Sequence, residues 1–205
     1  MARMTPNDRR EAIIVATLAV MQRQGIAATT VRDVAAELGA SSGLIHHYMS
    51  SMEELIAEAF ERAARADLLV TTDSVAQSQD PLEQLRSFFD SYSRSDDSSG
   101  MQLWLDAWSE AARRPALQQI SRQLNEMWQA LICRIITEGV HANLMNCSEP
   151  EAAAWRILSL IDGLTLQEIA HDNSVTSEQV TNWSRHGAEI ELGLSPGTLT
   201  APILP

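Results

Sequence analysis

The sequence predicts an all-α protein, and three of its features carry this prediction. Apolar residues recur at helical spacing in long segments, and no segment shows the strict alternation of a β-strand. Capping residues and glycine stops divide the chain at intervals that suit helices. The 205 residues are 45% hydrophobic with only 9 Gly and 7 Pro, which is enough to bury a sizeable core in one large or two small domains.

Four helices are expected near the N-terminus. Thr5 is a suitable N-cap with Pro6 at the first helical position. Thr30 and Asp33 have the spacing of a capping box. The expected helices run from Pro6 to about Gln24, from Thr30 to Gly39, from Ser41 or Ser42 over about two turns, and from Ser50 or Ser51 onward. Short helices joined by a glycine-containing turn are typical of a helix-turn-helix.

Five further helices are expected after a break between head and body at TTDSVAQSQDP, residues 71–81. The stretch SRSDDSSG, residues 93–100, is expected to be a solvated loop. The helices run from Asp80-Pro81 to about Tyr92, from Met101 to near Arg113–Pro115, from Leu117 to about Gly139, from Glu149 to about His171, and from about Ser177 to Leu192.

Charge is distributed unevenly along the chain. Lys+Arg 15 against Asp+Glu 27 gives a net charge of -12, which argues against a protein that coats nucleic acid or an anionic membrane. Residues 1–48, however, hold five arginines and four acids, or +1, which leaves -13 on the other 157 residues. A head without excess negative charge is able to approach a polyanion while the body avoids it. Every basic residue is Arg, which suits bidentate phosphate or guanine contacts, although codon bias explains this as simply.

Three observations bear on the compartment. Arg9 and Arg10 before AIIVATLAVM resemble part of a signal peptide, but no small-residue cleavage site follows promptly. No apolar run approaches the roughly 20 residues of a membrane span. Cys133 and Cys147 match no zinc or thioredoxin spacing, which suggests a reducing compartment. We expect a cytoplasmic protein with no membrane contact and no cofactor.

The stretch TTVRDVAAELGASSGLIHHYMSSMEEL, residues 29–55, resembles the DNA-binding head of the TetR family of bacterial transcriptional regulators, and the resemblance extends over residues 9–60. WLDAWSEAARRPAL (104–117) and LIDGLTLQ (160–167) resemble the C-terminal domain of the BetI-type subgroup, which is named for a choline-responsive repressor. The resemblance implies a helix-turn-helix DNA-binding domain over 1–50 and a ligand-binding and dimerisation domain over 51–205. It further implies a homodimer that binds near-palindromic, double-stranded operator DNA and is released by a small-molecule effector, with repression as the family default.

The same resemblance makes Ser41–Tyr48 the recognition helix, which enters the major groove while the helix at Thr30 braces it. Hydroxyls and helix N-terminal amides suit phosphates, and side chains in the groove suit base edges. Thr29, Thr30, Ser41 and Ser51 are expected at phosphates, Arg32, His47 and Tyr48 at phosphates or base edges, Ser42, Leu44 and His46 at base edges, and Gly43 where DNA approaches closely.

Other interpretations of these residues stay open. Tyr48 lies three residues after the expected core residue Ile45 and is as consistent with a core position. Leu44 either touches a thymine methyl group or packs in the head. His46 and His47 suggest a metal site, but adjacent helical residues point about 100° apart and no third ligand is evident, so we expect no metal.

Aromatic residues on the body helices are the expected effector contacts. Trp104 and Trp108 share a helix face, and an aromatic box suits a cationic or flat apolar ligand, with Asp106 or Glu110 to balance a charge. Aromatics at helical spacing are also typical of an ordinary core, and that interpretation stays open. The expected contacts, on helices that enclose the ligand cavity in the family, are Phe89, Tyr92, Met101, Trp104, Trp108 and Trp128.

Apolar surface on the last two helices predicts a homodimer interface. The last helix carries apolar residues at near-heptad spacing, and the helix before it is apolar over much of its circumference. Asp162 lies in the middle of that apolar helix, either in the ligand cavity or as a packing feature of the interface, and we favour the interface. The expected interface residues are Leu160, Asp162, Val180, Trp183 and Ile190.

Two other function classes compete with this prediction. An all-α enzyme that uses His171-Asp172 or His141 is disfavoured because no nucleophile or metal set lies near either histidine in the sequence. The second alternative is a ligand-binding helical protein with weakened DNA binding. The acidic net charge of the chain and the residue Met52 favour this alternative. The family commonly has Lys after the Ser that opens the fourth helix, placed to contact a phosphate; here Met52 is followed by Glu53 and Glu54, which add negative charge near the DNA.

Overall fold

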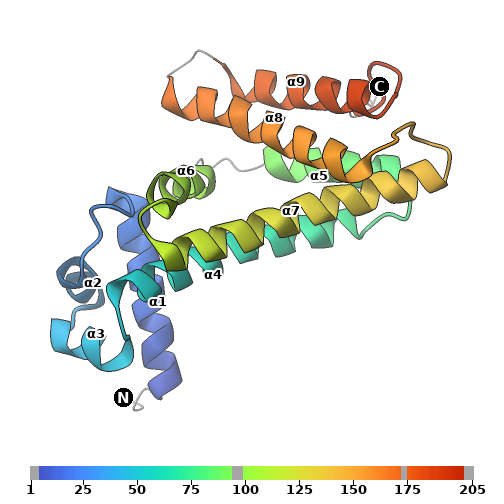
Figure 1. Cartoon of the computed structure of the whole chain (residues 1–205). Helices are drawn as coiled ribbons and strands as arrows, with labels where there is room; N and C mark the ends of the chain where they lie inside the picture. The colour runs from blue at the N-terminus through green and yellow to red at the C-terminus, as the bar shows by residue number, and fades with distance from the viewer. Residues whose placement is uncertain (1–4, 94–98, 172–174, 201–205) are drawn as a thin grey trace, which may run out of the picture. The chain divides into compact units, whose positions relative to one another are not determined.

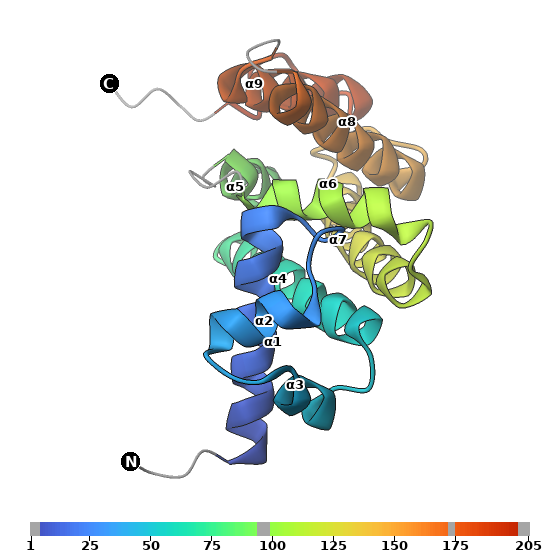
Figure 2. The same ribbon diagram turned by 90° about the vertical axis from the view of Figure 1, so that its left-hand side faces the viewer.

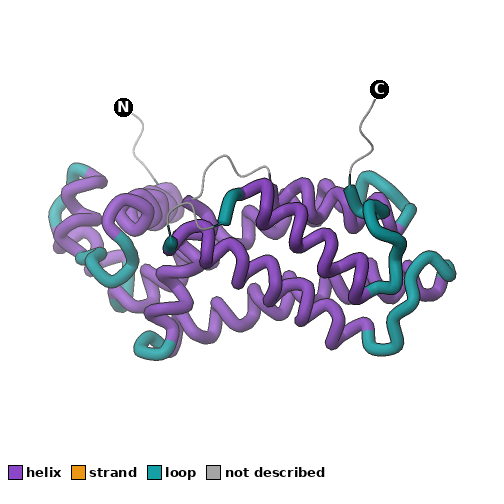
Figure 3. Tube along the Cα trace, turned by 90° about the horizontal axis from the view of Figure 1, so that it is seen from above, coloured by secondary structure: helices purple, strands orange, loops and turns teal. Residues whose placement is uncertain are grey.

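The computed structural model describes residues 5–93, 99–171 and 175–200. Over these ranges every regular element is a helix and no strand is present, which confirms the all-α prediction (Figure 3). No helix in the described part of the chain has both the length and the apolar character to cross a membrane. The chain divides into two compact units, residues 1–66 with 99–124 and residues 67–98 with 125–205.

The first unit holds the helix-turn-helix. It contains α1 (Pro6–Gln24), α2 (Val31–Leu38), α3 (Ser42–Tyr48), α6 (Ser99–Ala111) and the first turns of α4 (Met52–Val75) and α7 (Pro115–His141). Helix α2 lies across α1 with α3 beside it (Figure 2), and α1 also packs against α6.

Local chemistry sets the ends of α1 and α2. The Thr5 side chain accepts a hydrogen bond from the Asp8 amide, and the Asp8 carboxylate accepts one from the Thr5 amide, so the predicted capping residues form a complete box. Helix α2 has the same arrangement, and it ends at Gly39, whose φ of 64° is left-handed and costs glycine little. The helix-turn-helix therefore has sequence-encoded boundaries.

The second unit contains α5 (Pro81–Ser93), α8 (Pro150–Ala170), α9 (Ser177–Glu191) and the remaining turns of α4 and α7. Helices α8 and α9 run antiparallel to each other (Figure 1). They approach closely at Gly187, where a Cβ atom would lie 2.4 Å from Cδ2 of Leu160. A larger residue at this position would therefore require the end of the Leu160 side chain to move.

The expected break over residues 71–81 is wrong in its first half. Helix α4 continues to Val75, and only residues 76–80 separate it from α5. Thr71 and Val75 are buried and continue the buried face of α4 beyond Ala64 and Leu68. This burial outweighs the low helix propensity of the Thr, Asp and Ser residues there. The expected loop over 93–100 lies partly outside the described residues, since 94–98 are not described, and α6 already begins at Ser99.

Candidate functional site

Helix α2 presents Arg32 on its exposed side. The Thr30 hydroxyl donates a 2.5 Å hydrogen bond to Asp33, which in turn accepts from the Thr30 amide at 3.2 Å. Hydrogen bonding from the Thr30 side chain is the main reason that the pKa of Asp33 lies below its ordinary value. The box therefore stays formed at neutral pH and is weakened only as pH falls through that lowered pKa.

Helix α3 is held by a single fully buried side chain. Ile45 is buried, whereas Ser42, Gly43, His46 and His47 are exposed. We use the term α2–α3 surface for the exposed residues Thr30, Arg32, Ser41, Ser42, Gly43, His46 and His47. The side chains that this surface offers to a partner carry hydroxyl, guanidinium and imidazole groups.

Leu44 and Tyr48 border this surface without being fully exposed. Both side chains are half-buried. The Tyr48 ring stands edge-on to His47, with ring centroids 5.1 Å apart. The structure thus leaves Tyr48 between its two interpretations, because the side chain packs within the head and still reaches its surface.

Thr29 does not fit its expected role as a phosphate contact. Its side chain is only 5% exposed, and its hydroxyl donates a 2.8 Å hydrogen bond to the Gly25 carbonyl oxygen. Thr29 thus closes the turn after α1, and the adjacent Thr30 is the threonine at the surface. We leave Thr29 out of the proposed DNA contacts.

The start of α4 contains a contact that sequence reasoning missed. The Ser51 hydroxyl accepts from the Glu54 amide at 3.1 Å and so caps α4. Oε1 of Glu53 accepts a hydrogen bond from the Ala116 amide at 3.2 Å, in the first turn of α7. Glu53 was expected to favour the N-terminus of its own helix through the helix dipole and to add negative charge near the DNA. The sequence contains a signal for such a contact. Helix α7 begins at Pro115, and the side chain of the preceding residue, Arg114, has no acceptor with which to cap the helix.

The expected ligand aromatics fall into two groups, one in each compact unit. In the first unit, Trp104 packs edge-on against Phe60 of α4 at 4.9 Å and lies 5.6 Å from the Trp108 ring. Trp104 is only 7% exposed, and Trp108 and Met101 are half-buried. Trp104 therefore lies in the core of the unit that holds the helix-turn-helix, whereas Trp108 and Met101 are only partly covered.

In the second unit, Phe88 joins the two expected residues Phe89 and Trp128. The Phe88 ring lies 5.6 Å from Phe89 and 6.2 Å from Trp128, in edge-on geometry. Phe88 was not among the expected contacts, and the side chain of Tyr92 lies outside the described residues. Within each unit these contacts are those of an aromatic core.

Both expected counter-charges have contacts within the protomer. Glu110 is bound by Arg114 at 3.0 Å and by Arg113 at 3.3 Å, and hydrogen bonding to Arg114 is the main cause that lowers its pKa. A Cβ on Gly25 would lie 3.1 Å from Oδ2 of Asp106, so Asp106 is positioned against the end of α1.

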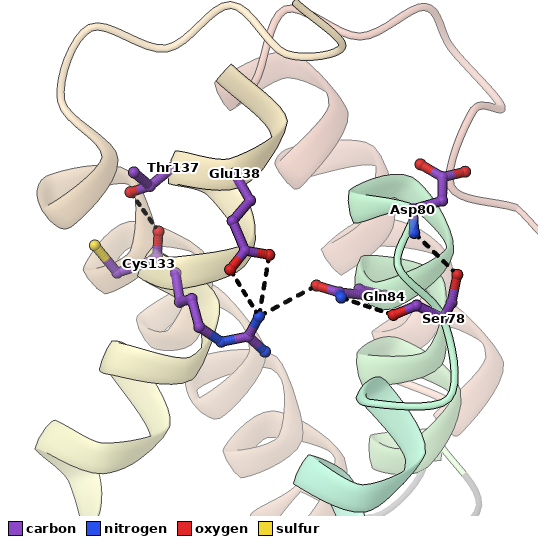
Figure 4. Close-up of polar contacts among 7 residues, drawn as sticks. Ser78, Asp80, Gln84, Cys133, Thr137 and Glu138 are labelled. Atoms are coloured by element: carbon purple, nitrogen blue, oxygen red, sulfur yellow. Dashed lines mark hydrogen bonds and ion pairs between the residues drawn. The ribbon is translucent and has the colours of Figure 1, made fainter. Parts of the chain in front are cut away.

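Polar contacts in the second unit join helices. The Gln84 side chain donates to the Ser78 carbonyl oxygen at 2.8 Å, and its oxygen accepts from Arg134 at 3.4 Å (Figure 4). Arg134 also pairs with Glu138 at 3.1 Å. Together these bonds fix the turn before α5 to α7.

The α8–α9 surface is defined by the exposed apolar residues Leu160, Leu166, Trp183 and Ile190. Trp183 is 47% and Ile190 69% exposed, and Asp162 is half-buried on α8. Val180 is a correction: it is only 6% exposed and packs within the protomer, because the buried stripe of α9 runs through Val180, Ser184 and Ala188. Leu166 was not among the expected residues.

The two histidines of the enzyme alternative lie at the surface. His141 and His171 are both exposed, and Asp172 lies outside the described residues. No group of three or more potential metal ligands occurs in the described part of the chain.

Comparison with known proteins is consistent with this fold and these surfaces. The sequence model for bacterial regulatory proteins of the tetR family matches residues 13–59, and that for the C-terminal domain of BetI-type transcriptional repressors matches residues 81–193. The regulator BetI 1 of Chromohalobacter salexigens is 32% identical over 168 residues, which cover 78% of each chain. BetI of Paraburkholderia xenovorans is 30% identical over 167 residues, covering 78% of this chain and 80% of the relative.

Solved structures show the same fold. A transcriptional regulator from Saccharomonospora viridis, solved in complex with choline, superposes with a TM-score of 0.82 at 20% identity and covers 91% of this chain and 98% of its own. One from Pseudomonas aeruginosa gives a TM-score of 0.78 at 23% identity, with 91% of each chain covered. The curated relatives are named as transcriptional regulators, which are not enzymes. The chain therefore belongs to the TetR family of bacterial transcriptional regulators and carries the C-terminal domain of its BetI-type members.

Proposed function

We propose that this regulator is a repressor that binds a near-palindromic operator as a homodimer through its α2–α3 surface. The observation that carries the proposal is the state of α3, which buries Ile45 and exposes hydroxyl and imidazole side chains. Such groups suit phosphates and base edges, where contacts stay partly hydrated. A helix with one buried anchor also leaves most of its surface to a partner.

Gly43 supports the same proposal. A Cβ at this position would meet only Oγ of Ser41, at 3.8 Å, so packing within the protein does not require glycine. Glycine inside a helix costs roughly 0.5–1 kcal/mol relative to alanine. A close approach by the DNA backbone accounts for a glycine that the fold itself does not need.

The α8–α9 surface supports the dimer. Trp183 and Ile190 are large apolar residues that the protomer leaves exposed. Exposed apolar area of this kind is typical of an interface, and a two-fold dimer presents two identical heads to the two halves of a near-palindrome.

The effector is proposed to be a small molecule that binds the body and changes the spacing of the heads. Such a ligand shifts a two-state equilibrium only if it binds the two states with different affinity. Choline is the first probe to test, because the Saccharomonospora viridis regulator holds it and aromatic rings suit a quaternary ammonium group.

A mobility-shift assay with DNA from upstream of the regulator's own gene tests the proposal, and operators selected from random duplexes by the wild-type protein extend it. We expect a sequence-specific complex with two subunits per site. Arg32→Ala should weaken the complex, and an effector should dissolve it. If the folded dimer binds no DNA at all, the alternative of a ligand-binding helical protein with weakened DNA binding is correct.

A further inference from the structure

The charge of Glu53 has a structural partner, although the sequence presents it as an obstacle to DNA binding. Glu53 is the second residue of α4 and Ala116 is the second residue of α7. The Glu53 carboxylate accepts the Ala116 amide at 3.2 Å across 63 residues of sequence. Both residues lie in the first compact unit.

Helix α7 needs this acceptor because it has no cap of its own. Its first residue, Pro115, has no amide hydrogen, and the preceding residue, Arg114, has only donors in its side chain. The Ala116 amide is therefore one of the helix-end donors that require an outside partner. A carboxylate at a helix N-terminus is also favoured by the helix dipole.

The contact lies close in sequence to the segment that joins α3 to α4. Three residues separate Tyr48 at the end of α3 from Met52 at the start of α4. The segment is short, and Met49 within it is buried. A bond that fixes the first turn of α4 therefore also limits where the end of α3 can lie.

We propose that Glu53 is a positioning residue for DNA binding, because its carboxylate ties the first turn of α4 to the first turn of α7 and so holds α3 in its DNA-binding position. This inference rests on the proposed function. It assigns Glu53 a role opposite in sign to that of a repelling charge. Removal of a repelling charge tightens DNA binding, whereas removal of a tie weakens it.

The test compares Glu53→Ala with Glu53→Gln and with Glu54→Ala. Glu54 is the matched control, since it is the next acid in the same helical turn and its partner is Ser50 rather than α7. We expect Glu53→Ala to weaken binding to a selected operator about five- to tenfold and to speed hydrogen exchange at the Ala116 amide about tenfold. Glu53→Gln keeps an acceptor oxygen, so it should retain most of the operator affinity and most of the protection of the Ala116 amide from exchange. Glu54→Ala should leave exchange at Ala116 unchanged and should weaken DNA binding less than Glu53→Ala does, because its partner Ser50 lies in the segment before α4 and not in α7.

A second variant separates the tie from the stability of α7. Arg114→Ser gives α7 a local cap, so in the Glu53→Ala background it should restore slow exchange at Ala116 without restoring operator affinity. Recovery of affinity by this local cap would overturn the positioning role, as would tighter DNA binding by Glu53→Ala or unchanged exchange at Ala116. If wild-type protein binds no DNA, the proposed function itself fails; if only the Glu53 variants bind normally, this inference alone fails.

Discussion

The α2–α3 surface and the α8–α9 surface are both left open by the protomer, but their chemistry is opposite. On α3 the apolar residue Ile45 points inward and the exposed positions carry small polar or imidazole side chains. On α9 the exposed positions include Trp183 and Ile190. Exposed polar groups suit a hydrated, salt-dependent partner, whereas exposed apolar groups are stabilised by a partner that removes water. The two surfaces therefore suit different kinds of partner.

The two surfaces also differ in how firmly their helices are held. Helix α8 buries Ala153, Ile157 and Ile161 along one face, so its packing within the protomer fixes its position. Helix α3 has seven residues and one buried side chain. Its position must depend on its neighbours. For this reason we expect a contact such as that of Glu53 to matter more for α3 than the ion pair of Arg156 with Glu191 matters for α8 and α9.

The largest effect is expected from charge on the α8–α9 surface. Leu160→Glu with Ile190→Glu should convert the proposed dimer to a monomer, because an unpaired charge buried in an interface is costly. Operator affinity should fall by at least about 100-fold, since half-sites are then bound singly. Analytical ultracentrifugation measures the first effect and a mobility shift the second.

Val70→Glu is the matched control for that experiment. Val70 on α4 is 69% exposed, as is Ile190, so it tests the effect of a new surface charge outside the α8–α9 surface. We expect Val70→Glu to stay dimeric. A dimeric double mutant, or a monomeric control, would show that the interface lies elsewhere.

A smaller effect is expected on the α2–α3 surface, where contacts to phosphate and to bases should separate. Arg32→Ala should weaken binding to all sequences alike, by about tenfold, and Tyr48→Phe should act in the same uniform way if Tyr48 holds phosphate. Ser42→Ala or His46→Ala should relax sequence preference and leave non-specific binding nearly intact. A base-substitution scan of the operator measures both; an Arg32→Ala effect confined to one base pair would reassign Arg32 to base recognition.

The starts of α1 and α2 were predictable because caps are local. Thr5 with Asp8 and Thr30 with Asp33 form the predicted boxes within one turn of chain. Thr29 and Thr30 look alike in sequence, however, and only the turn after α1 brings the Thr29 hydroxyl back to the Gly25 carbonyl oxygen. The local pattern gives the helix, but not which of two neighbouring hydroxyls faces outward.

Tertiary packing explains the other differences between prediction and structure. Val180, Trp183 and Ile190 have near-heptad spacing, which suggests that they lie on one face of the helix. In the structure the buried stripe of α9 runs from Val180 through the polar residue Ser184. A pattern of apolar residues does not reveal such a position. The contact between Glu53 and Ala116 joins residues that no local pattern connects. Such features depend on which helices meet.

Gly43→Ala should change stability and DNA affinity in opposite directions. Alanine in the helix should stabilise the fold by roughly 0.5–1 kcal/mol, because the site has room for a Cβ and alanine loses less backbone entropy. Operator affinity should fall about fivefold if the DNA backbone approaches this position closely. Thermal unfolding measures the change in stability, and operator titration measures the change in affinity. Equal or tighter operator binding would show that Gly43 does not face DNA.

A salt-dependent effect is expected at Met52, which lies at the first position of α4 and is half-buried. Met52→Lys should place a positive charge at the position where the family resemblance leads us to expect one, and neutralise one more phosphate per subunit. The slope of log affinity against log salt should then steepen by about two units per dimer, with tighter binding at low salt. Operator titrations at several salt concentrations measure the slope.

Met52→Gln is the control, since it changes the polarity of the side chain at similar length without adding charge. If Met52 only packs beneath the head, both variants should lower the melting temperature and neither should change the salt slope. If the position faces DNA, only Lys steepens the slope, even though a cation at a helix N-terminus is slightly unfavourable to the helix dipole. An unchanged slope in a stably folded Met52→Lys protein would place the start of α4 away from the DNA. The DNA-facing surface would then be confined to α2 and α3, and Glu53 would have no proximity to DNA through which to act as a repelling charge.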